Sequence, residues 1–311
     1  MNTSRAAAGI AARFAEYLAR IEPRQGVLDA AVKRSAGIHG AILRSMQVAR
    51  VARVGSFYKG TAIANASDLD FFVVIRREDV RWAGTMVSSA TVLGNIRSAI
   101  LDRYPRSNIG KDGSAVVVEF ADGIPIDVVP AIFASPLQTG HPLYSIPDGE
   151  GGYLDTAPDA QRAAFLAADF RAGGKLSRVI KLVKTWAYYR DAPLPISSFY
   201  LETVLATAGI ADGPRSYSAA LSDAMKVLAE RGVTALRDPL GISGNIPPAR
   251  TRAQRELIAR SLSFAADHAE CAYDAERGGD TSEAARQWRM VLPGFRGLLG
   301  TYGPCADELL G

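Results

Sequence analysis

The chain has 311 residues, of which 48% are apolar and 22% charged, a composition typical of a globular protein with an ample core. It contains no apolar run long enough for a transmembrane helix, and its first residues lack the continuous apolar core of a signal peptide. The net charge of +4 is carried by scattered arginines without a run of five like charges, which does not favour a nucleic-acid-binding surface. Only Cys271 and Cys305 are cysteines, so we expect free thiols, a cytoplasmic protein and no membrane partner.

Two helices are predicted first along the chain. Residues 5–21 place apolar side chains at helical spacing and end before Pro23, and a second helix is predicted from about residue 25 to 46. Neither segment carries residues of evident chemistry. We therefore expect residues 1–46 to form a packing layer of the first lobe.

A glycine and a serine follow a short strand-like run. Gly55 allows the backbone to come close to a ligand, and Ser56 at the turn can offer a hydroxyl and an N–H group to a phosphate. Eleven residues separate Ser56 from the next group of polar residues, Asp68 and Asp70. A phosphate-binding turn close to an acid pair is typical of a nucleotide-handling site.

Residues 68–75 predict a buried strand that begins with two acids. Asp68 and Asp70 are separated by one residue, so on a strand their carboxylates point to the same side. Two like charges at a buried strand repel each other unless a cation lies between them. Carboxylate oxygens suit Mg²⁺ or Mn²⁺, and the spacing therefore predicts a divalent-metal site.

A third acid is predicted on a neighbouring strand. After a helix near residues 84–103, residues 114–129 predict a hairpin with its turn at Asp122-Gly123. Asp127 lies between two apolar residues of the second strand and needs a partner there. Three carboxylates can hold two metal ions for phosphoryl transfer.

The sheet is expected to occupy roughly residues 50–133, and residues 134–158 are rich in proline and glycine. This composition predicts a linker or surface loop that ends the first lobe. From residue 159 onward the pattern is helical, with helices predicted at about 174–189, 218–231, 250–276 and 281–288.

Two segments of the helical part carry candidate residues. Lys181 and Lys184 share a face of the 174–189 helix; taken alone, this pattern is also that of a solvated helix face. Ser197 or Ser198 is a candidate N-cap of the following helix. An anion is also well held at such a position, because free N–H groups point outward there.

Gly55-Ser56, the eleven-residue gap, Asp68-Leu69-Asp70 and the later Asp127 together resemble the polymerase-β-like nucleotidyltransferases. Within that superfamily the chain is most similar to bacterial enzymes related to cyclic GMP–AMP synthase and oligoadenylate synthase. The resemblance implies an α+β protein with two lobes. Residues 1–158 would form a mixed-sheet catalytic lobe and residues 159–311 a helical lobe, with nucleotides in the cleft between them.

The resemblance also implies roles for individual residues. Asp68, Asp70 and Asp127 would hold two Mg²⁺ ions, with Mn²⁺ as a substitute. Further residues would bind the donor nucleotide: Gly55, Ser56, Lys184 and Ser198 at its phosphates, and Phe199 by stacking on its base. If Phe199 is only a core residue, Tyr200 is the alternative.

The activity implied is the joining of nucleoside triphosphates into a cyclic or short linear oligonucleotide, with release of pyrophosphate. Such products serve as second messengers to a downstream effector in anti-phage defence. Three alternatives remain open: tailing of RNA, modification of a small molecule such as an antibiotic, and a non-catalytic nucleotide-binding module. The absence of a basic stripe argues against RNA, and the three intact acids argue against a dead enzyme.

Overall fold

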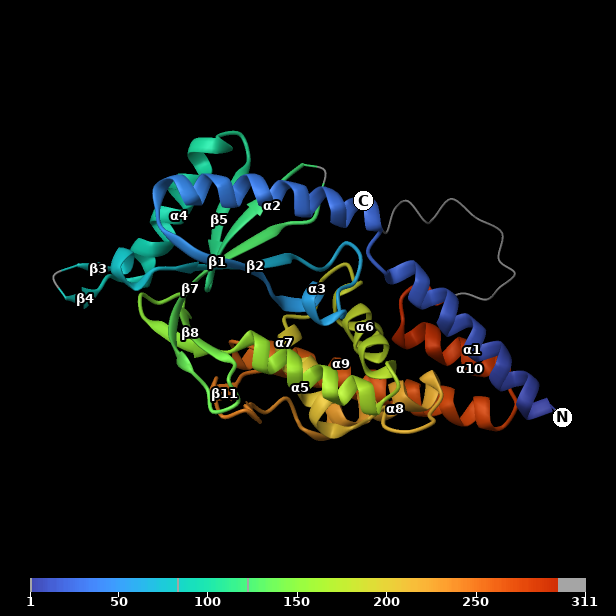
Figure 1. The fold of residues 1–311 in the computed structure, drawn as a ribbon. Coiled ribbons are helices and arrows are strands. Elements are labelled where there is room, and N and C mark those ends of the chain that lie inside the picture. The colour runs from blue at the N-terminus through green and yellow to red at the C-terminus, as the bar shows by residue number, and fades with distance from the viewer. Residues whose placement is uncertain (1, 83, 122, 296–311) are drawn as a thin grey trace. The chain divides into compact units, whose positions relative to one another are not determined.

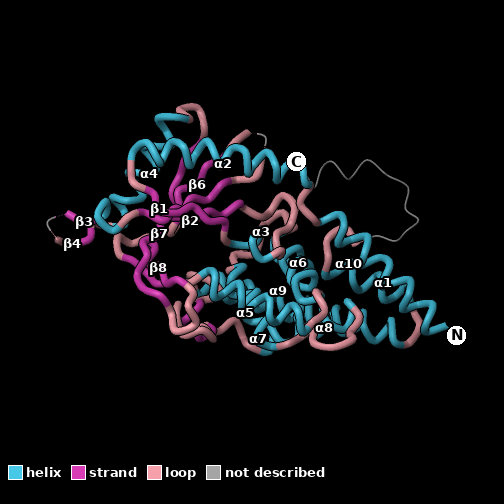
Figure 2. Tube along the Cα trace, in the orientation of Figure 1, coloured by secondary structure: helices cyan, strands magenta, loops and turns pink. Residues whose placement is uncertain are grey.

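A computed structural model of the chain describes residues 2–82, 84–121 and 123–295. Contacts divide the chain into two compact units. The sheet unit comprises Pro23–Ala164 with Leu240–Ser243, and the helical unit comprises the residues up to Glu22, Phe165–Pro239 and the residues from Gly244 onward. Figure 2 shows that the long strands belong to the sheet unit, whereas the helical unit is almost entirely helix.

In the described residues, the sheet unit is built on one seven-stranded mixed sheet (Figure 1). Five strands follow the order β1-β2-β7-β6-β5, β8 pairs with β7, and β9 pairs with β8. Neighbours β2 and β7 run parallel, and the other neighbours are antiparallel. The strands are β1 (Val48–Arg53), β2 (Leu69–Ile75), β5 (Asn108–Asp112), β6 (Ala115–Glu119), β7 (Ile126–Pro136), β8 (Pro142–Pro147) and β9 (Tyr153–Thr156). The mixed α+β class predicted from the sequence is confirmed.

Alternation along β2 and β7 separates two apolar layers. Phe71 and Val73 point to the face covered by helices α2 (Gln25–Ser45) and α4 (Ser89–Arg103). Phe72 points to the opposite face, where it packs with a second, smaller group of buried residues. Because side chains alternate with a period of two, Asp70 and Asp127 belong to this second face.

Several local predictions differ from the structure. The proposed loop at 134–158 contains the end of β7 and all of β8 and β9. Pro136, Pro142 and Pro147 lie at strand ends, where the missing N–H group costs no ladder hydrogen bond, and Pro158 begins α5. The predicted helix at 84–103 begins only at Ser89. It is preceded by a 3₁₀ turn, η1 (Arg77–Val80), and by two short antiparallel strands, β3 (Arg81–Trp82) and β4 (Thr85–Met86).

Helices dominate the helical unit. They are α1 (Asn2–Ile21), the second half of α5 (Pro158–Arg171), α6 (Lys175–Tyr188), α7 (Ser198–Ala208), α8 (Tyr217–Glu230), α9 (Arg252–Arg277) and α10 (Thr281–Val291). A short hairpin of β10 (Leu236–Arg237) and β11 (Asn245–Ile246) precedes α9. None of the helices in the described part of the chain is both long and apolar enough to cross a membrane.

Helix α1 packs within the helical unit rather than with the sheet, which differs from the expected boundary of the first lobe. The Phe14 ring is fully buried, 5.3 Å from the ring of Trp288 and 5.0 Å from that of Phe295. The Tyr17 hydroxyl donates to the Pro293 carbonyl at 2.7 Å. These contacts join the two ends of the described chain.

Two predictions involve residues outside the described parts. Asp122, in the predicted hairpin turn, is one of them, although the strands β6 and β7 on either side pair antiparallel as expected. Cys305 is the other. Cys271 is exposed and its thiol is free.

Candidate active site

The parallel pairing of β2 and β7 brings two of the three predicted acids together. Asp70 and Asp127 are register partners, as are Leu69 and Ile126 just before them. Their side chains therefore lie next to each other on the same face of the sheet. Asp68 is exposed and lies one residue before β2.

Asp127 is in an unfavourable electrostatic position. One of its carboxylate oxygens, Oδ1, is buried and has no hydrogen-bond partner among the described residues. Burial raises the pKa of Asp127 to about 8, with further contributions from the negative charges of Asp68, Asp70 and Asp112. Such a carboxyl becomes ionised at neutral pH only when a cation compensates its charge.

The same face carries two acids that the sequence analysis did not single out. Asp112 lies on β5 and Glu119 on β6. Loss of solvation around the carboxyl group raises the pKa of Asp68, and the negative charges of Asp112 and Glu119 raise it further. The pairing of the hairpin strands could have predicted the position of Glu119. Val117 pairs with Asp127, so the alternation of side chains places Glu119 on the same side of the sheet as the predicted acids. The Asn108 amide donates to the Glu119 carboxylate at 2.5 Å.

The acids fit a divalent cation by their chemistry, although their side chains do not converge on one point. Among the described residues, no group of three or more His, Cys, Asp or Glu side chains could hold a metal ion as placed. The buried, unpartnered oxygen of Asp127 beside Asp70 is nevertheless a donor set of the kind that Mg²⁺ uses.

Gly55 is required beside Asp70 for two reasons. Its φ of +69° lies in the left-handed region, which favours glycine. A Cβ atom at this position would also overlap the Asp70 carboxylate. The approach is fixed by the backbone, since the Val54 N–H donates to the Asp70 carbonyl at 2.9 Å. Ser56 follows in the short helix α3 (Gly55–Lys59), so the structure places the predicted phosphate turn next to the acid pair.

Helix α3 is held by the first turns of α5. The Arg162 Nε donates to the Tyr58 carbonyl at 2.9 Å, and its guanidinium lies 4.1 Å from the centre of the Tyr58 ring. Asp159 forms an ion pair with Arg50 at 3.6 Å and accepts a long hydrogen bond from the Tyr58 hydroxyl at 3.5 Å. These contacts, all within the sheet unit, fix the helix that begins with Gly55 and Ser56.

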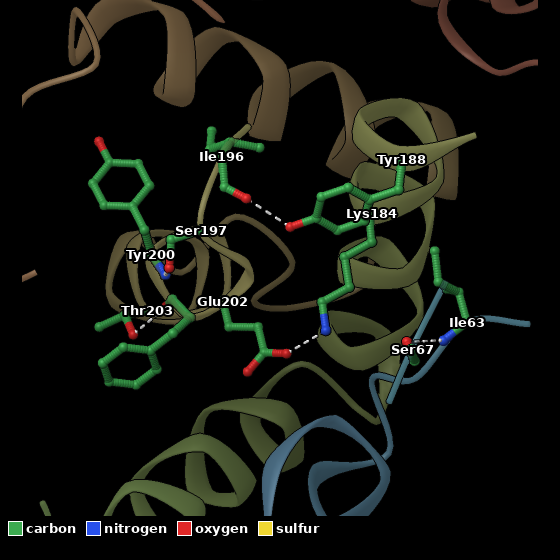
Figure 3. Close-up of polar contacts among 10 residues, drawn as sticks. Ile63, Ser67, Lys184, Tyr188, Ile196, Ser197, Tyr200, Glu202 and Thr203 are labelled. Carbon is green, nitrogen blue, oxygen red and sulfur yellow. Dashed lines mark hydrogen bonds and ion pairs between the residues drawn. The ribbon is translucent and has the colours of Figure 1, made fainter. Parts of the chain in front are cut away.

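In the helical unit, Lys184 is buried rather than solvated. Its ammonium lies 2.6 Å from the Glu202 carboxylate, and the two side chains are only 2% and 5% exposed (Figure 3). Lys181, three residues earlier, pairs with Glu22 at 2.8 Å. The solvated-face interpretation therefore does not describe Lys184.

The remaining candidate residues lie at the start of α7 and differ in burial and in hydrogen bonding. Ser197 is the N-cap, and its hydroxyl accepts from the Tyr200 N–H at 3.2 Å (Figure 3). Ser198 is exposed and Phe199 is partly exposed. Tyr200 is 1% exposed, and its hydroxyl donates to the Thr234 carbonyl at 2.9 Å. The Tyr200 ring therefore belongs to the core, which leaves Phe199 as the aromatic side chain with an accessible surface.

Comparison with known proteins identifies the family to which the chain is similar. A family model described as Second Messenger Oligonucleotide or Dinucleotide Synthetase domain matches residues 9–167, a range that includes the three acids and Gly55-Ser56. The chain is also 25% identical over 179 residues to a probable cyclic nucleotide synthase of Bacillus cereus (strain VD146). That alignment covers 49% of this chain and 53% of the relative, so the chain spans about half the length of this curated relative.

Solved structures show a similar fold over a larger share of the chain. CdnC of E. coli MS115-1 with ATP gives a TM-score of 0.70 at 20% identity, covering 92% of this chain and 98% of that one. CdnG of Bradyrhizobium diazoefficiens with GTP gives a TM-score of 0.66 at 16% identity, and the match covers 89% of this chain and 96% of that one. Vibrio cholerae DncV, in complex with a linear intermediate, gives a TM-score of 0.61 at 16% identity, and the match covers 79% of this chain and 68% of that one. At these low sequence identities, the structural similarity shows that the fold is shared.

Proposed function

Because the chain belongs to the family of Second Messenger Oligonucleotide or Dinucleotide Synthetase domains, we propose that it is a nucleotidyltransferase that joins nucleoside triphosphates into a cyclic or short linear oligonucleotide. The observation that carries the proposal is the register of β2 and β7, which sets Asp70 beside Asp127 with an unpartnered buried oxygen. A purely structural sheet has no use for two adjacent carboxylates on a half-buried face.

Asp68, Asp70 and Asp127 are the residues that would hold Mg²⁺ or Mn²⁺. When bound, the metal ions would make the acceptor hydroxyl more acidic and neutralise the triphosphate and the leaving pyrophosphate. The contribution of Gly55 is to let the backbone of α3 lie against Asp70 without a clash. The N–H groups and hydroxyl at Ser56 would bind the donor phosphates, and Arg162 fixes α3 for this task.

The helical unit holds the second group of proposed donor-binding residues. The exposed Ser198 lies in the first turn of α7, where free N–H groups favour a phosphate. Phe199, partly exposed, would stack on the donor base. Lys184 would supply positive charge close by.

The reaction forms a bond between a ribose hydroxyl oxygen and an α-phosphorus, and it breaks the bond from that phosphorus to the pyrophosphate. The hydroxyl proton is lost to solvent or to a carboxylate of the site. We further propose that the product is a cytoplasmic signal to an effector in anti-phage defence, a role in keeping with the family's description as second-messenger synthetases.

The experiment that tests this proposal is incubation of the pure protein with all four nucleoside triphosphates and Mg²⁺ or Mn²⁺, followed by mass analysis of the products. We expect a small, phosphatase-resistant cyclic product that forms through a linear intermediate. Long tails on added RNA, with no small product from the triphosphates alone, would favour an RNA-tailing enzyme instead. Unchanged triphosphates under all conditions would favour a non-catalytic nucleotide-binding module.

A further inference from the structure

Glu202 lies on α7, one helical turn beyond Ser198, and faces Lys184 on α6. Figure 3 shows the Lys184 ammonium directed at the Glu202 carboxylate. The two groups are 2.6 Å apart. Both side chains are nine-tenths buried or more. A buried ion pair of this kind lies within a single unit of the protein and was not predicted from the sequence.

Two more polar side chains belong to the same contact between α6 and α7. Tyr188 follows Lys184 by one turn of α6, and its hydroxyl donates to the Ile196 carbonyl at 2.7 Å. Burial raises the pKa of Tyr188, the negative charge of Glu202 raises it further, and a hydrogen bond with Ser198 acts in the opposite direction. Tyr188 is thus hydrogen-bonded to the exposed Ser198 and lies within electrostatic reach of Glu202.

Stability does not explain why this pair is charged. The cost of removing two charges from water generally cancels their attraction, and well-packed apolar replacements of buried pairs are often neutral or stabilising. Removal of one partner is different, because it leaves an uncompensated charge in the interior. The ionic form therefore indicates a use for the charge itself, beside the turn of α7 that carries Ser198.

We propose that Glu202 is a positioning residue for the donor triphosphate: its carboxylate holds the Lys184 ammonium in one place inside the helical unit, next to the N-terminal part of α7. The inference rests on the proposed function. A triphosphate would then meet a preorganised positive charge and would not have to order a flexible lysine, which lowers the entropy cost of binding. Lys184 binds the donor, and Glu202 acts only through Lys184.

The test separates charge from packing with two variants. Glu202→Gln keeps the shape but removes the carboxylate charge, and Lys184→Met/Glu202→Leu replaces the pair with apolar side chains. Affinity is measured for a non-hydrolysable ATP analogue with Mg²⁺ by calorimetry, and stability is measured by urea unfolding. Glu22→Gln is the matched control, because it removes the carboxylate partner of the neighbouring Lys181.

We expect the double variant to unfold at the same urea concentration as the wild type or higher, yet to bind the analogue at least tenfold more weakly. Glu202→Gln should raise the KM for the donor about tenfold with little change in kcat, and Glu22→Gln should bind like the wild type. If the double variant binds the analogue as tightly as the wild type, the pair is structural and the inference is overturned. If the wild type itself does not bind the analogue, the proposed function fails as well, so the two failures are distinguishable.

Discussion

The buried carboxyl group of Asp127 affects both the stability of the folded protein and its proposed binding of a metal ion. Its pKa in the folded protein is about 8, against an ordinary value of 3.8. Between these pH values the folded protein holds a proton that the unfolded chain has lost, so stability decreases as the pH rises from about 4 to 8. Above about pH 8 both states are ionised and the decrease ends.

We therefore predict that the metal-free protein is more stable at pH 5 than at pH 8, and that Asp127→Asn reduces this difference. At pH 8 the variant should be more stable than the wild type by about 1–3 kcal/mol, the usual cost of a buried unsatisfied polar group. Denaturant unfolding in the presence of a chelator measures both effects. Addition of Mg²⁺ at pH 8 should stabilise the wild type only. Parallel pH dependences for the two proteins would contradict the assignment.

Single changes at the three acids should abolish activity without unfolding the protein. Asp68→Asn, Asp70→Asn and Asp127→Asn each remove one carboxylate charge, and we expect pyrophosphate release to fall by about 10³-fold or more. Asp102→Asn is the control, because Asp102 is an exposed acid of α4 in the same unit. Near-wild-type turnover in any of the three variants would remove that acid from the set.

Among the elements, α3 depends on its contact with α5. Arg162→Gln removes both the hydrogen bond to the Tyr58 carbonyl and the stacking on the Tyr58 ring. Under the proposed role of Ser56 at the donor phosphates, a small displacement of this residue weakens binding, so we predict an increase in donor KM of about tenfold, in line with the cost of misplaced binding groups. Steady-state kinetics of pyrophosphate release measure this. Arg171→Gln on the same helix, whose side chain is 57% exposed, should leave KM unchanged.

The elements also show what local sequence patterns predict well. The strand at 68–75 and the hairpin around Asp127 were predicted correctly, because uninterrupted β-forming residues and alternation are local signals. The strands within residues 134–158 were not predicted, because the prolines there suggested a loop, whereas the structure places Pro136, Pro142 and Pro147 at strand ends. The contact of Arg162 with Tyr58 and that of Lys184 with Glu202 join residues distant in sequence, and no pattern in a single sequence predicts such pairs.

For the whole molecule, the α+β class followed from the order of strands and helices, but the packing of α1 did not. The spacing of Phe14 and Tyr17 predicts an apolar helix face, without indicating which surface covers that face. The structure shows that this face packs against Trp288 of α10 and against Pro293 and Phe295 just after it, so α1 completes the core of the helical unit.

We predict that Phe14→Ala destabilises the helical unit by about 3–5 kcal/mol, because it removes a fully buried ring and leaves a cavity. Native-state hydrogen exchange should then become faster in α8, α9 and α10, with little change in β2 and β7 of the sheet unit. Phe170→Ala is the matched control: this phenylalanine belongs to the same unit but is 86% exposed, so the change should stay within about 0.5 kcal/mol. Equal acceleration of exchange in β2 and in α10 would mean that the two units unfold as one, and would contradict the separate stability of the helical unit.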